Sequence, residues 1–366
     1  MNKTFKTILA LAIGAVAMTF ASCSDADSIN EEQAWDGKVG ALIDLHCHLD
    51  GAVDFATARE LAKMNGMPEL SDDKLYELTV AGPECHDLLY FLTKFAYVDE
   101  LLQTKEAITY AVNRLVHRLH DDGAIYAEIR FAPCFHLGKG LTQEEVVEAA
   151  IAGLDDDVMP ARIILCLVRL DHDVYDAMNQ KTAEVAVKYH GKGVVALDLA
   201  CDDGTYAIKP YASYLNYARE HGVPLSVHAG ETAVSGAWSV RDIMELGASR
   251  IDHGIQAYKD KALMAEIAQR GLVMTVCPSS YVCTGIFPTH ADVPVRQLMQ
   301  ASCKVCINTD DMSTIGTTLS KEYQLARDTY GLSKEEIAML LHNAADGAFV
   351  DASLRAKLHK QIDDFY

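Results

Sequence analysis

The sequence predicts an α/β protein, a (β/α)8 TIM barrel with a helical insertion between strands 1 and 2. Three observations predict it: eight short apolar runs recur along the chain, helical segments lie between them, and polar residues follow several of the runs. Continuous Val, Ile and Leu runs are typical of parallel strands buried on both faces. Eight strand-then-helix units favour a barrel. An open doubly wound sheet is the alternative, but its Gly-x-Gly-x-x-Gly turn is absent from the sequence.

The apolar runs set the bounds of the expected strands. These strands span 41–49, 125–131, 162–170, 194–200, 224–229, 250–253, 272–277 and 304–308. Amphipathic stretches between the strands predict outer helices, because apolar residues recur there at helical spacing. The clearest of these stretches are 142–154, 211–221, 240–246 and 259–270, and two last helices near 334–345 and 352–363 are expected to complete the outer ring.

One connection is much longer than the others. Between Gly51 and Gly123 there is room for four helices, which we expect at 55–65, 71–78, 87–95 and 105–120. Long insertions of this kind usually cover or shape an active site. The insertion is therefore expected to lie over the functional end of the barrel.

The N-terminal residues are expected to stand outside the barrel. A basic start, an apolar run and the small residues Ala21-Ser22-Cys23 are typical of a secretory signal that is too short to span a membrane. Ala21-Ser22-Cys23 resembles the lipobox of bacterial lipoproteins, with Phe20 in place of the usual leucine. We expect a lipoprotein signal peptide at 1–22, lipidation of Cys23, a polar tether at 23–39 and a single barrel domain at 40–366. An ordinary cleaved signal, with Cys23 incidental, is the alternative.

Composition limits the classes of partner. The chain has 366 residues, of which 50% are hydrophobic, and a formal net charge of −20. A nucleic-acid surface needs an excess of Lys and Arg, so no nucleic-acid partner is expected. Membrane contact is expected only through a lipid anchor on Cys23. The chain would then be an exported, membrane-anchored bacterial lipoprotein that faces the periplasm or the cell surface, and its oligomeric state stays open.

Histidines and carboxylates follow the predicted strands. His46 and His48 close the first run, and residues two apart on a strand point to the same face. Other strand ends carry Asp198 with Asp202 and Asp203, His228 with Glu231, His253, and Asp310 with Asp311. A single loop aspartate is usually a turn former or a helix cap. Because the strand ends of a barrel converge on one face, five such ends predict one shared site.

The residue types at these ends suit a zinc ion. Imidazole nitrogen and carboxylate oxygen are common zinc ligands. The predicted ligands of one Zn²⁺ are His46, His48, His228 and Asp310. Zinc lowers the pKa of a bound water from 15.7 to about 7. Glu231 is the candidate general acid, and His253 is a candidate ligand, orienting group or general base.

Several motifs in this order resemble the adenosine deaminase family of the amidohydrolase superfamily over residues 41–345. The most specific are His228-Ala229-Gly230-Glu231 and Asn308-Thr309-Asp310-Asp311. They are joined by His46-Cys47-His48-Leu49-Asp50-Gly51-Ala52, Ala127-Glu128-Ile129-Arg130-Phe131-Ala132-Pro133, Arg250-Ile251-Asp252-His253-Gly254 and Val276-Cys277-Pro278-Ser279-Ser280.

The resemblance implies a reaction and a role for each matching residue. Zinc is held by the four predicted ligands, Glu231 protonates purine N1 and His253 orients the attacking hydroxide or accepts its proton. The implied substrate contacts are His48, Asp50, Cys201 and Asp311, with Asp50 on a ribose hydroxyl and Asp311 on purine N7. The implied activity is zinc-dependent hydrolytic deamination of adenosine or 2'-deoxyadenosine to inosine or 2'-deoxyinosine and ammonia. It would serve purine salvage or the removal of extracellular adenosine.

Three residues depart from the family pattern. Cys201 stands where a glycine backbone approaches purine N3, so its side chain narrows the expected pocket. Asp252 replaces a glycine and is expected to place a negative charge beside His253, and Met312 replaces a proline. These departures bear on the substrate, so a deaminase of a modified adenosine or of adenine is an alternative.

Other classes of protein are alternatives too. A surface lipoprotein that binds nucleosides without turnover is one, although a binding protein has no need of Glu231. A two-metal amidohydrolase usually carries a bridging lysine on strand four, and 194–201 contains none. The zinc deaminases with a His-x-Glu signature do not fit, because two residues separate His228 from Glu231.

Overall fold

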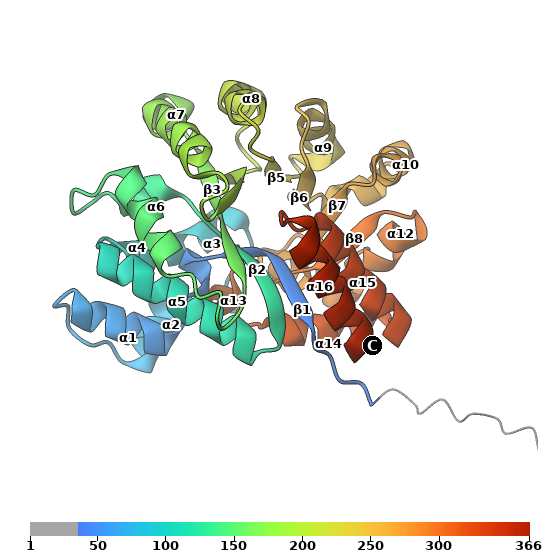
Figure 1. The fold of residues 1–366 in the computed structure, drawn as a ribbon, viewed down its shortest axis with the longest axis horizontal. Coiled ribbons are helices and arrows are strands. Elements are labelled where there is room, and N and C mark those ends of the chain that lie inside the picture. Colours follow the sequence, from blue (N-terminus) through green and yellow to red (C-terminus); the bar gives the residue numbers. More distant parts are fainter. Residues whose placement is uncertain (1–35) are drawn as a thin grey trace, which may run out of the picture. The chain divides into compact units, whose positions relative to one another are not determined.

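Eight parallel strands lie at the centre of the unit Gly37–Tyr366 in the computed structural model, which describes residues 36–366 (Figure 1). They are β1 (Leu42–His48), β2 (Ala124–Phe131), β3 (Ala161–Arg169), β4 (Val194–Cys201), β5 (Ser226–Ala229), β6 (Arg250–His253), β7 (Val273–Val276) and β8 (Lys304–Ile307). Hydrogen bonding joins them in order within two halves, β1 to β4 and β5 to β8. The eight predicted strands are confirmed, with ends within two residues of the predicted ones.

Backbone contacts at two seams close the halves into a barrel. At one seam Leu197 N donates to Pro224 O at 3.0 Å, between β4 and the start of β5. At the other, His48 N donates to Asp310 O and Asp310 N donates to His46 O, both at 2.8 Å. The (β/α)8 barrel is therefore confirmed. Closure also brings Asp310, at the far end of the chain, next to the two histidines of β1.

Helices surround the strands. They include α6 (Gln143–Ala152), α7 (His172–Tyr189), α8 (Ala212–Glu220), α9 (Gly236–Glu245), α10 (Lys261–Arg270), α12 (Val295–Gln300), α14 (Leu319–Tyr330), α15 (Lys334–Gly347) and α16 (Ala352–Phe365). In Figure 1, α7 to α10 follow one another around the strands. Local sequence explains where several begin: Thr142 and Ser333 start α6 and α15 with capping boxes. Helices α7, α12 and α14 come in addition to those predicted.

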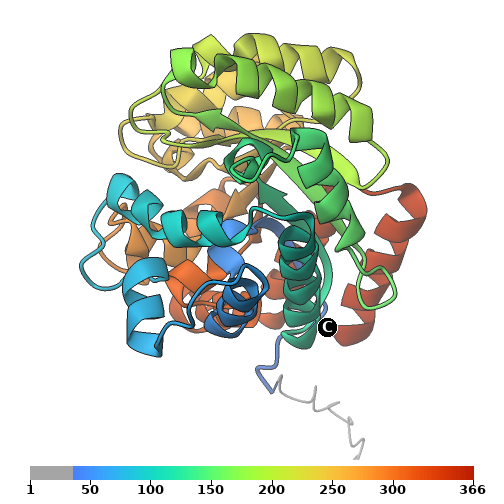
Figure 2. The same ribbon diagram turned by 90° about the vertical axis from the view of Figure 1, so that its left-hand side faces the viewer.

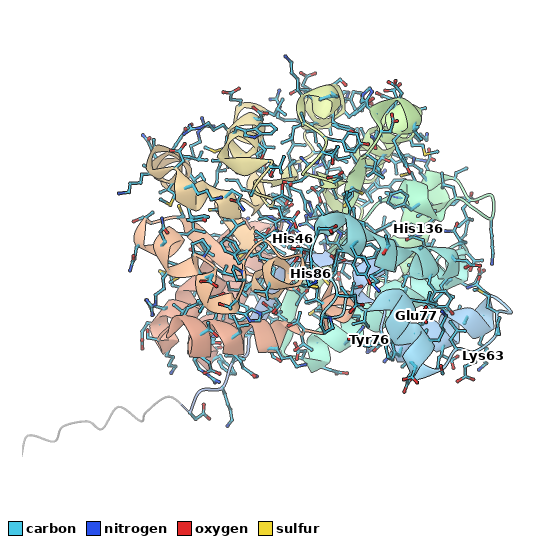
Figure 3. All side chains as sticks on the ribbon, turned by 180° about the vertical axis from the view of Figure 1, so that it is seen from behind. His46, Lys63, Tyr76, Glu77, His86 and His136 are labelled. Carbon is cyan, nitrogen blue, oxygen red and sulfur yellow. The ribbon has the colours of Figure 1, made fainter. Side chains whose placement is uncertain are left out.

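The insertion between β1 and β2 is helical, as predicted. It contains α1 (Phe55–Met64), α2 (Asp72–Thr79), α3 (Leu88–Leu92), α4 (Ala96–Leu101) and α5 (Lys105–Asp121), with a short 3-10 turn, Thr93–Phe95, between α3 and α4. Figure 2 faces these helices. The single helix expected at 87–95 is wrong in detail: it ends at Leu92, and α4 follows the turn. Seen from behind in Figure 3, His46 lies near the centre, whereas Lys63, Tyr76 and Glu77 lie out on the insertion.

The N-terminal predictions fall mostly outside the described residues. The signal peptide at 1–22, the lipidation of Cys23 and most of the tether at 23–39 lie there, and they stay predictions. Within residues 36–366, every helix is too short or too polar to cross a membrane.

Candidate active site

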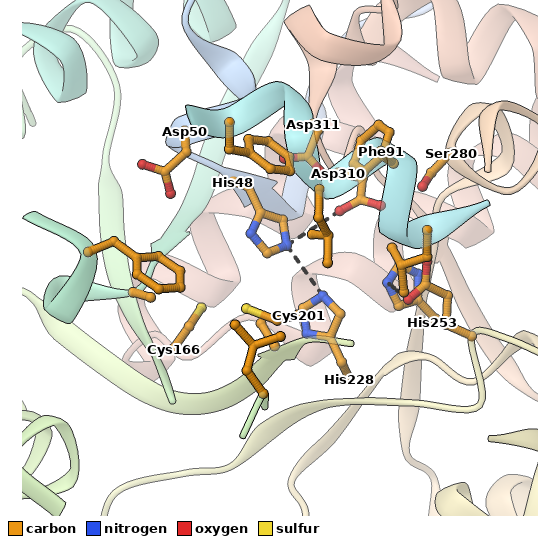
Figure 4. A pocket seen from close by; sticks show the side chains of 18 of the residues that line it. His48, Asp50, Phe91, Cys166, Cys201, His228, His253, Ser280, Asp310 and Asp311 are labelled. Carbon is orange, nitrogen blue, oxygen red and sulfur yellow. Dashed lines mark hydrogen bonds and ion pairs between the residues drawn. The ribbon is translucent and has the colours of Figure 1, made fainter. Parts of the chain in front are cut away.

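One pocket at the carboxyl ends of the strands contains the predicted functional residues (Figure 4). Its polar lining comprises His48, Asp50, Asp99, Cys201, His228, Glu231, His253, Ser280, Asp310 and Asp311. His46 does not line the pocket but contacts its floor, because its side chain is fully buried and its Nε2 lies 3.3 Å from Asp310 Oδ1. The structure thus brings together all the predicted site residues of the barrel.

Four of these residues form a cluster with the geometry of a metal site. The ligand atoms of His46, His48, His228 and Asp310 all lie within 4.8 Å of one another. His48 Nε2 is 3.3 Å from His228 Nε2 and 3.4 Å from Asp310 Oδ1. Zinc bonds of ~2.0 to 2.1 Å in a tetrahedron separate the ligand atoms by roughly 3.3 Å. The separations of 3.3 to 3.4 Å therefore fit the spacing of zinc ligands.

Neighbouring side chains hold two of these histidines in the ligand orientation. His46 Nδ1 lies 2.9 Å from Thr275 Oγ1, and its buried Nε2 has no hydrogen bond. His228 Nδ1 lies 2.9 Å from Asp198 Oδ2. A metal-binding histidine usually hydrogen-bonds through its other ring nitrogen in this way. The unpaired Nε2 of His46 is explained by a metal ligand role.

A buried arginine links the supports of both histidines. Arg130 Nη1 lies 2.9 Å from Asp198 Oδ2 and 2.6 Å from Asp252 Oδ2, and all three side chains are fully buried. Burial alone raises a carboxyl pKa, but the adjacent Arg130 guanidinium holds the pKa of Asp252 well below its usual value. Arg130 was a motif residue without an assigned role. Two charged residues inside a mostly apolar strand, Glu128 and Arg130, were the available signal of buried ion pairs.

Asp252 is paired mainly with groups other than His253, and its charge has a smaller effect on the pKa of His253 than burial and the charges of His46, Asp310 and His228. Its Oδ1 accepts a hydrogen bond from Thr275 Oγ1 at 2.9 Å and lies 3.6 Å from His46 Nδ1. Its Oδ2 lies against Arg130. The expected charge beside His253 is therefore turned toward the arginine and the His46 ligand, because alternate residues of β6 face opposite sides of the strand.

Glu231 is buried beside the metal cluster. It is 4% exposed, and its backbone N–H donates to Asp203 Oδ2 at 3.2 Å. Burial first, and then the charges of Asp203 and Asp310, raise the pKa of Glu231 well above its usual value. This environment favours the protonated form of the carboxyl group. Glu231 is therefore suited to donate a proton.

His253 faces Glu231 and is oriented by a tyrosine. Its Nε2 lies 3.7 Å from Glu231 Oε2 and its Nδ1 lies 3.2 Å from the Tyr281 hydroxyl. Burial, followed by the charge of His46, lowers the pKa of His253 well below its usual value. A neutral imidazole in this position can accept a proton from a water at the metal cluster.

Asp311 approaches the backbone of the turn after β1. A Cβ on Gly51 would lie 1.9 Å from Asp311 Oδ1, so no larger residue fits at that position. Burial and then the adjacent Asp310 raise the pKa of Asp311 well above its usual value. Its buried Oδ1 has no hydrogen bond. A protonated Asp311 can therefore donate to an acceptor atom of a ligand.

Backbone strain is concentrated at this site. Among residues 36–366, only five residues other than glycine have positive φ, and three of them are Cys201 at 91°, His253 at 59° and Asp310 at 61°. Positive φ is costly for residues with a Cβ, and it is tolerated where the surroundings enforce it, often at functional sites. Cys201 occupies such a backbone position and also lines the pocket.

The far end of the pocket is acidic. Asp50 lies beyond His48, on the side away from His253 (Figure 4). Asp99, from α4, lines the same pocket, and no Lys or Arg is among the described residues that line it. Sequence reasoning did not single out Asp99, because nothing in the pattern of the insertion places it near Asp50.

Comparisons with known proteins agree with the geometry. The adenosine deaminase family matches residues 41–365. The adenosine deaminase of Enterococcus faecalis is 36% identical over 329 residues, which cover 88% of this chain and 96% of that protein. The enzyme of Haemophilus ducreyi is 35% identical over 335 residues, which cover 89% and 96%.

Solved structures share the fold at lower identity. An adenine deaminase from Arthrobacter aurescens has a TM-score of 0.78 and 23% identity, covering 89% of this chain and 99% of that one. A zinc-bound amidohydrolase from Burkholderia ambifaria has a TM-score of 0.79 and 23% identity, and the match covers 88% of this chain and 91% of that one. An Arabidopsis N6-mAMP deaminase has a TM-score of 0.77 and 21% identity, and the match covers 90% of this chain and 99% of that one. The chain belongs to the adenosine deaminase family and is a hydrolytic deaminase.

Proposed function

We propose that this protein deaminates adenosine and 2'-deoxyadenosine hydrolytically, with one zinc ion per chain, to give inosine or 2'-deoxyinosine and ammonia. The observation that carries the proposal is the meeting of a four-ligand cluster with two carboxyl groups of raised pKa, Glu231 and Asp311, in one pocket. Such a site offers a place for a metal ion and two proton donors for the nitrogens of a purine.

Each side chain then has a defined task. Zinc on His46, His48, His228 and Asp310 would lower the pKa of a bound water toward neutrality. Glu231 donates its proton to purine N1, which makes C6 a better electrophile, and Asp311 donates a hydrogen bond to N7. His253 accepts a proton as water adds to C6. The proton taken up by His253 passes to the amino group, the C6–N bond breaks and ammonia leaves. The C6 hydroxyl then returns a proton to Glu231, which gives inosine.

The charge of the pocket favours a nucleoside over a nucleotide. Asp50 and Asp99 line it without a described Lys or Arg, so a phosphate group would meet like charge. The Arabidopsis N6-mAMP deaminase acts on a nucleotide, and a relative from the same plant has been solved with IMP. This acidic lining supports a neutral substrate for the present chain.

Cys201 favours a second candidate function, in which the substrate is a modified adenosine or adenine. Its side chain lines the pocket on a backbone with φ of 91°. A sulfur atom at this position reduces the space for the base. A panel of adenosine, 2'-deoxyadenosine, N6-methyladenosine and adenine distinguishes these substrates.

The test is an ultraviolet assay of protein from Gly37 onward, loaded with zinc or stripped by a chelator. We expect the adenosine spectrum to change to that of inosine, with ammonia released, only when metal is bound. No change with any purine of the panel, from protein holding one zinc per chain, would contradict the proposal.

We further propose that the protein is exported and anchored through a lipid on Cys23, so that it removes adenosine outside the cytoplasm or salvages purines. The support is the sequence Ala21-Ser22-Cys23 after an apolar run. Fractionation of cells expressing the full chain tests this, with Cys23→Ser as the variant. The chain should move from the membrane to the soluble fraction on substitution, and an unaltered distribution would contradict the anchor.

A further inference from the structure

A second polar cluster lies at the acidic end of the pocket. Asp50 follows β1, Asp99 belongs to α4, and His136 closes the short 3-10 helix Pro133–His136 after β2. One side-chain nitrogen or oxygen from each of the three lies within 4.8 Å of the others. His136 Nε2 is 3.3 Å from Asp50 Oδ1. Three elements that are distant in sequence thus contribute to one cluster.

The cluster is held by the fold rather than by its own hydrogen bonds. His136 is 0% exposed. Its Nε2 and Asp50 Oδ1 contact each other at 3.3 Å outside hydrogen-bond geometry, and neither these two atoms nor His136 Nδ1 has a hydrogen bond. Gln103 fixes the position of the cluster by donating from Nε2 to Asp99 O at 2.6 Å and to Phe135 O at 2.9 Å. Buried polar atoms without partners are rare, and they call for a ligand or a water.

The chemistry of the cluster matches a hydroxyl group. Burial first, and then the charge of Asp50, raise the pKa of Asp99 to about 7. The carboxyl groups and the imidazole of the cluster together offer hydrogen-bond donors and acceptors within 4.8 Å of one another. A hydroxyl group both donates and accepts, whereas a phosphate only accepts and carries negative charge.

We propose that Asp99 contacts a sugar hydroxyl of the substrate, and that His136 is a positioning residue that holds Asp50 for the same contact. The cluster thereby selects unphosphorylated nucleosides. This inference rests on the proposed function, because it concerns the substrate of that reaction. Asp99 is thus a specificity residue contributed by the insertion.

The test uses the zinc-loaded full chain and the variant Asp99→Asn, which keeps the shape of the side chain. Glu100→Gln is the matched control, because Glu100 is the next residue of α4, carries the same charge and is exposed. Substrates are adenosine, its 2'-, 3'- and 5'-deoxy analogues, and AMP. We expect Asp99→Asn to raise KM for adenosine about tenfold with kcat within about twofold.

The deoxy analogues show whether the contact is direct. For the analogue that lacks the contacted hydroxyl, Asp99→Asn should change KM less than about twofold, and AMP should become a better substrate. His136→Gln should give the same selective pattern, with thermal unfolding as a check on its fold. Glu100→Gln should leave KM and kcat unchanged for all five substrates.

Two outcomes overturn the inference in distinguishable ways. If the wild-type chain deaminates adenosine but Asp99→Asn affects adenosine and every analogue equally, or none of them, the specificity role is wrong and the proposed function stands. If the wild-type chain deaminates none of the purines, the proposed function fails and the inference fails with it.

Discussion

The floor and the roof of the pocket differ in how firmly they are held. The floor is formed by the strand ends with the metal cluster and the Arg130 network, and its charged side chains are buried and paired. The roof is formed by α3 and α4, which have five and six residues, and by the 3-10 turn between them. These elements contribute Leu88, Phe91, Leu92, Phe95 and Asp99 to the pocket. Short helices with half-buried side chains are held by fewer contacts. The floor should therefore govern the chemical step, and the roof should govern which substrate is bound and how tightly.

The largest expected effect is at the floor. Glu231→Gln removes the proton donor but keeps the shape of the side chain, so kcat should fall by a factor of about a thousand or more. Adenosine binding, measured by calorimetry, should change less than about threefold. Retained turnover would contradict the acid role, and it would also show that the floor does not govern chemistry.

The pH profile of kcat sharpens the same point. The pKa of Glu231 is raised by burial and by Asp203 and Asp310, and the protonated form is the active one. Activity should therefore be present below this raised pKa and should fall about tenfold per pH unit above it. A steady-state rate profile from pH 5 to pH 10 checks this. The residual rate of Glu231→Gln should lack this alkaline limb.

The next largest effect is expected at the buried Arg130 network that supports the floor. Arg130→Met leaves Asp198 and Asp252 buried without their cation, so unfolding free energy should fall by about 3 to 5 kcal/mol. Zinc content per chain should fall as well, because both carboxylates orient metal ligands. Denaturant unfolding and metal analysis measure the two effects. A variant with unchanged stability and full zinc would show that the network is not needed.

A roof substitution should behave differently. Leu88→Ala removes apolar contact with the substrate, so KM for adenosine should rise about three- to tenfold while kcat stays within about twofold. Leu89→Ala is the matched control, because Leu89 is 57% exposed and does not line the pocket. A fall in kcat with unchanged KM would break the distinction between roof and floor.

The smallest expected effect is at Cys201. Cys201→Gly relieves the backbone strain of a φ of 91° and widens the pocket, so kcat/KM for adenosine should rise about two- to fivefold. Initial rates at several adenosine concentrations measure it. An unchanged or lower value would show that Cys201 does not crowd the base, and the modified-purine candidate would lose its support.

The strands and the residues of the four-ligand cluster could be predicted because their signals are local. An apolar run of a few residues ends in His46 and His48, and another ends next to Asp310, whatever the rest of the chain does. The partners of Arg130 could not be predicted, because they lie on β4 and β6 and no local pattern links them. The pairing of Asp252 with Arg130 could not be predicted for the same reason. It depends on which neighbour its face of the strand meets.

By itself, then, the sequence determined the alternation of strands and helices, the long insertion and the residue types at the strand ends. Local periodicity and motif spacing carry that information. Only the tertiary structure decided the closure that sets Asp310 against the two histidines of β1, the ion pairs of Arg130, and the meeting of Asp99 with His136. The physical reason is that burial and charge pairing depend on distances between residues far apart in the chain, and only the closed barrel sets those distances.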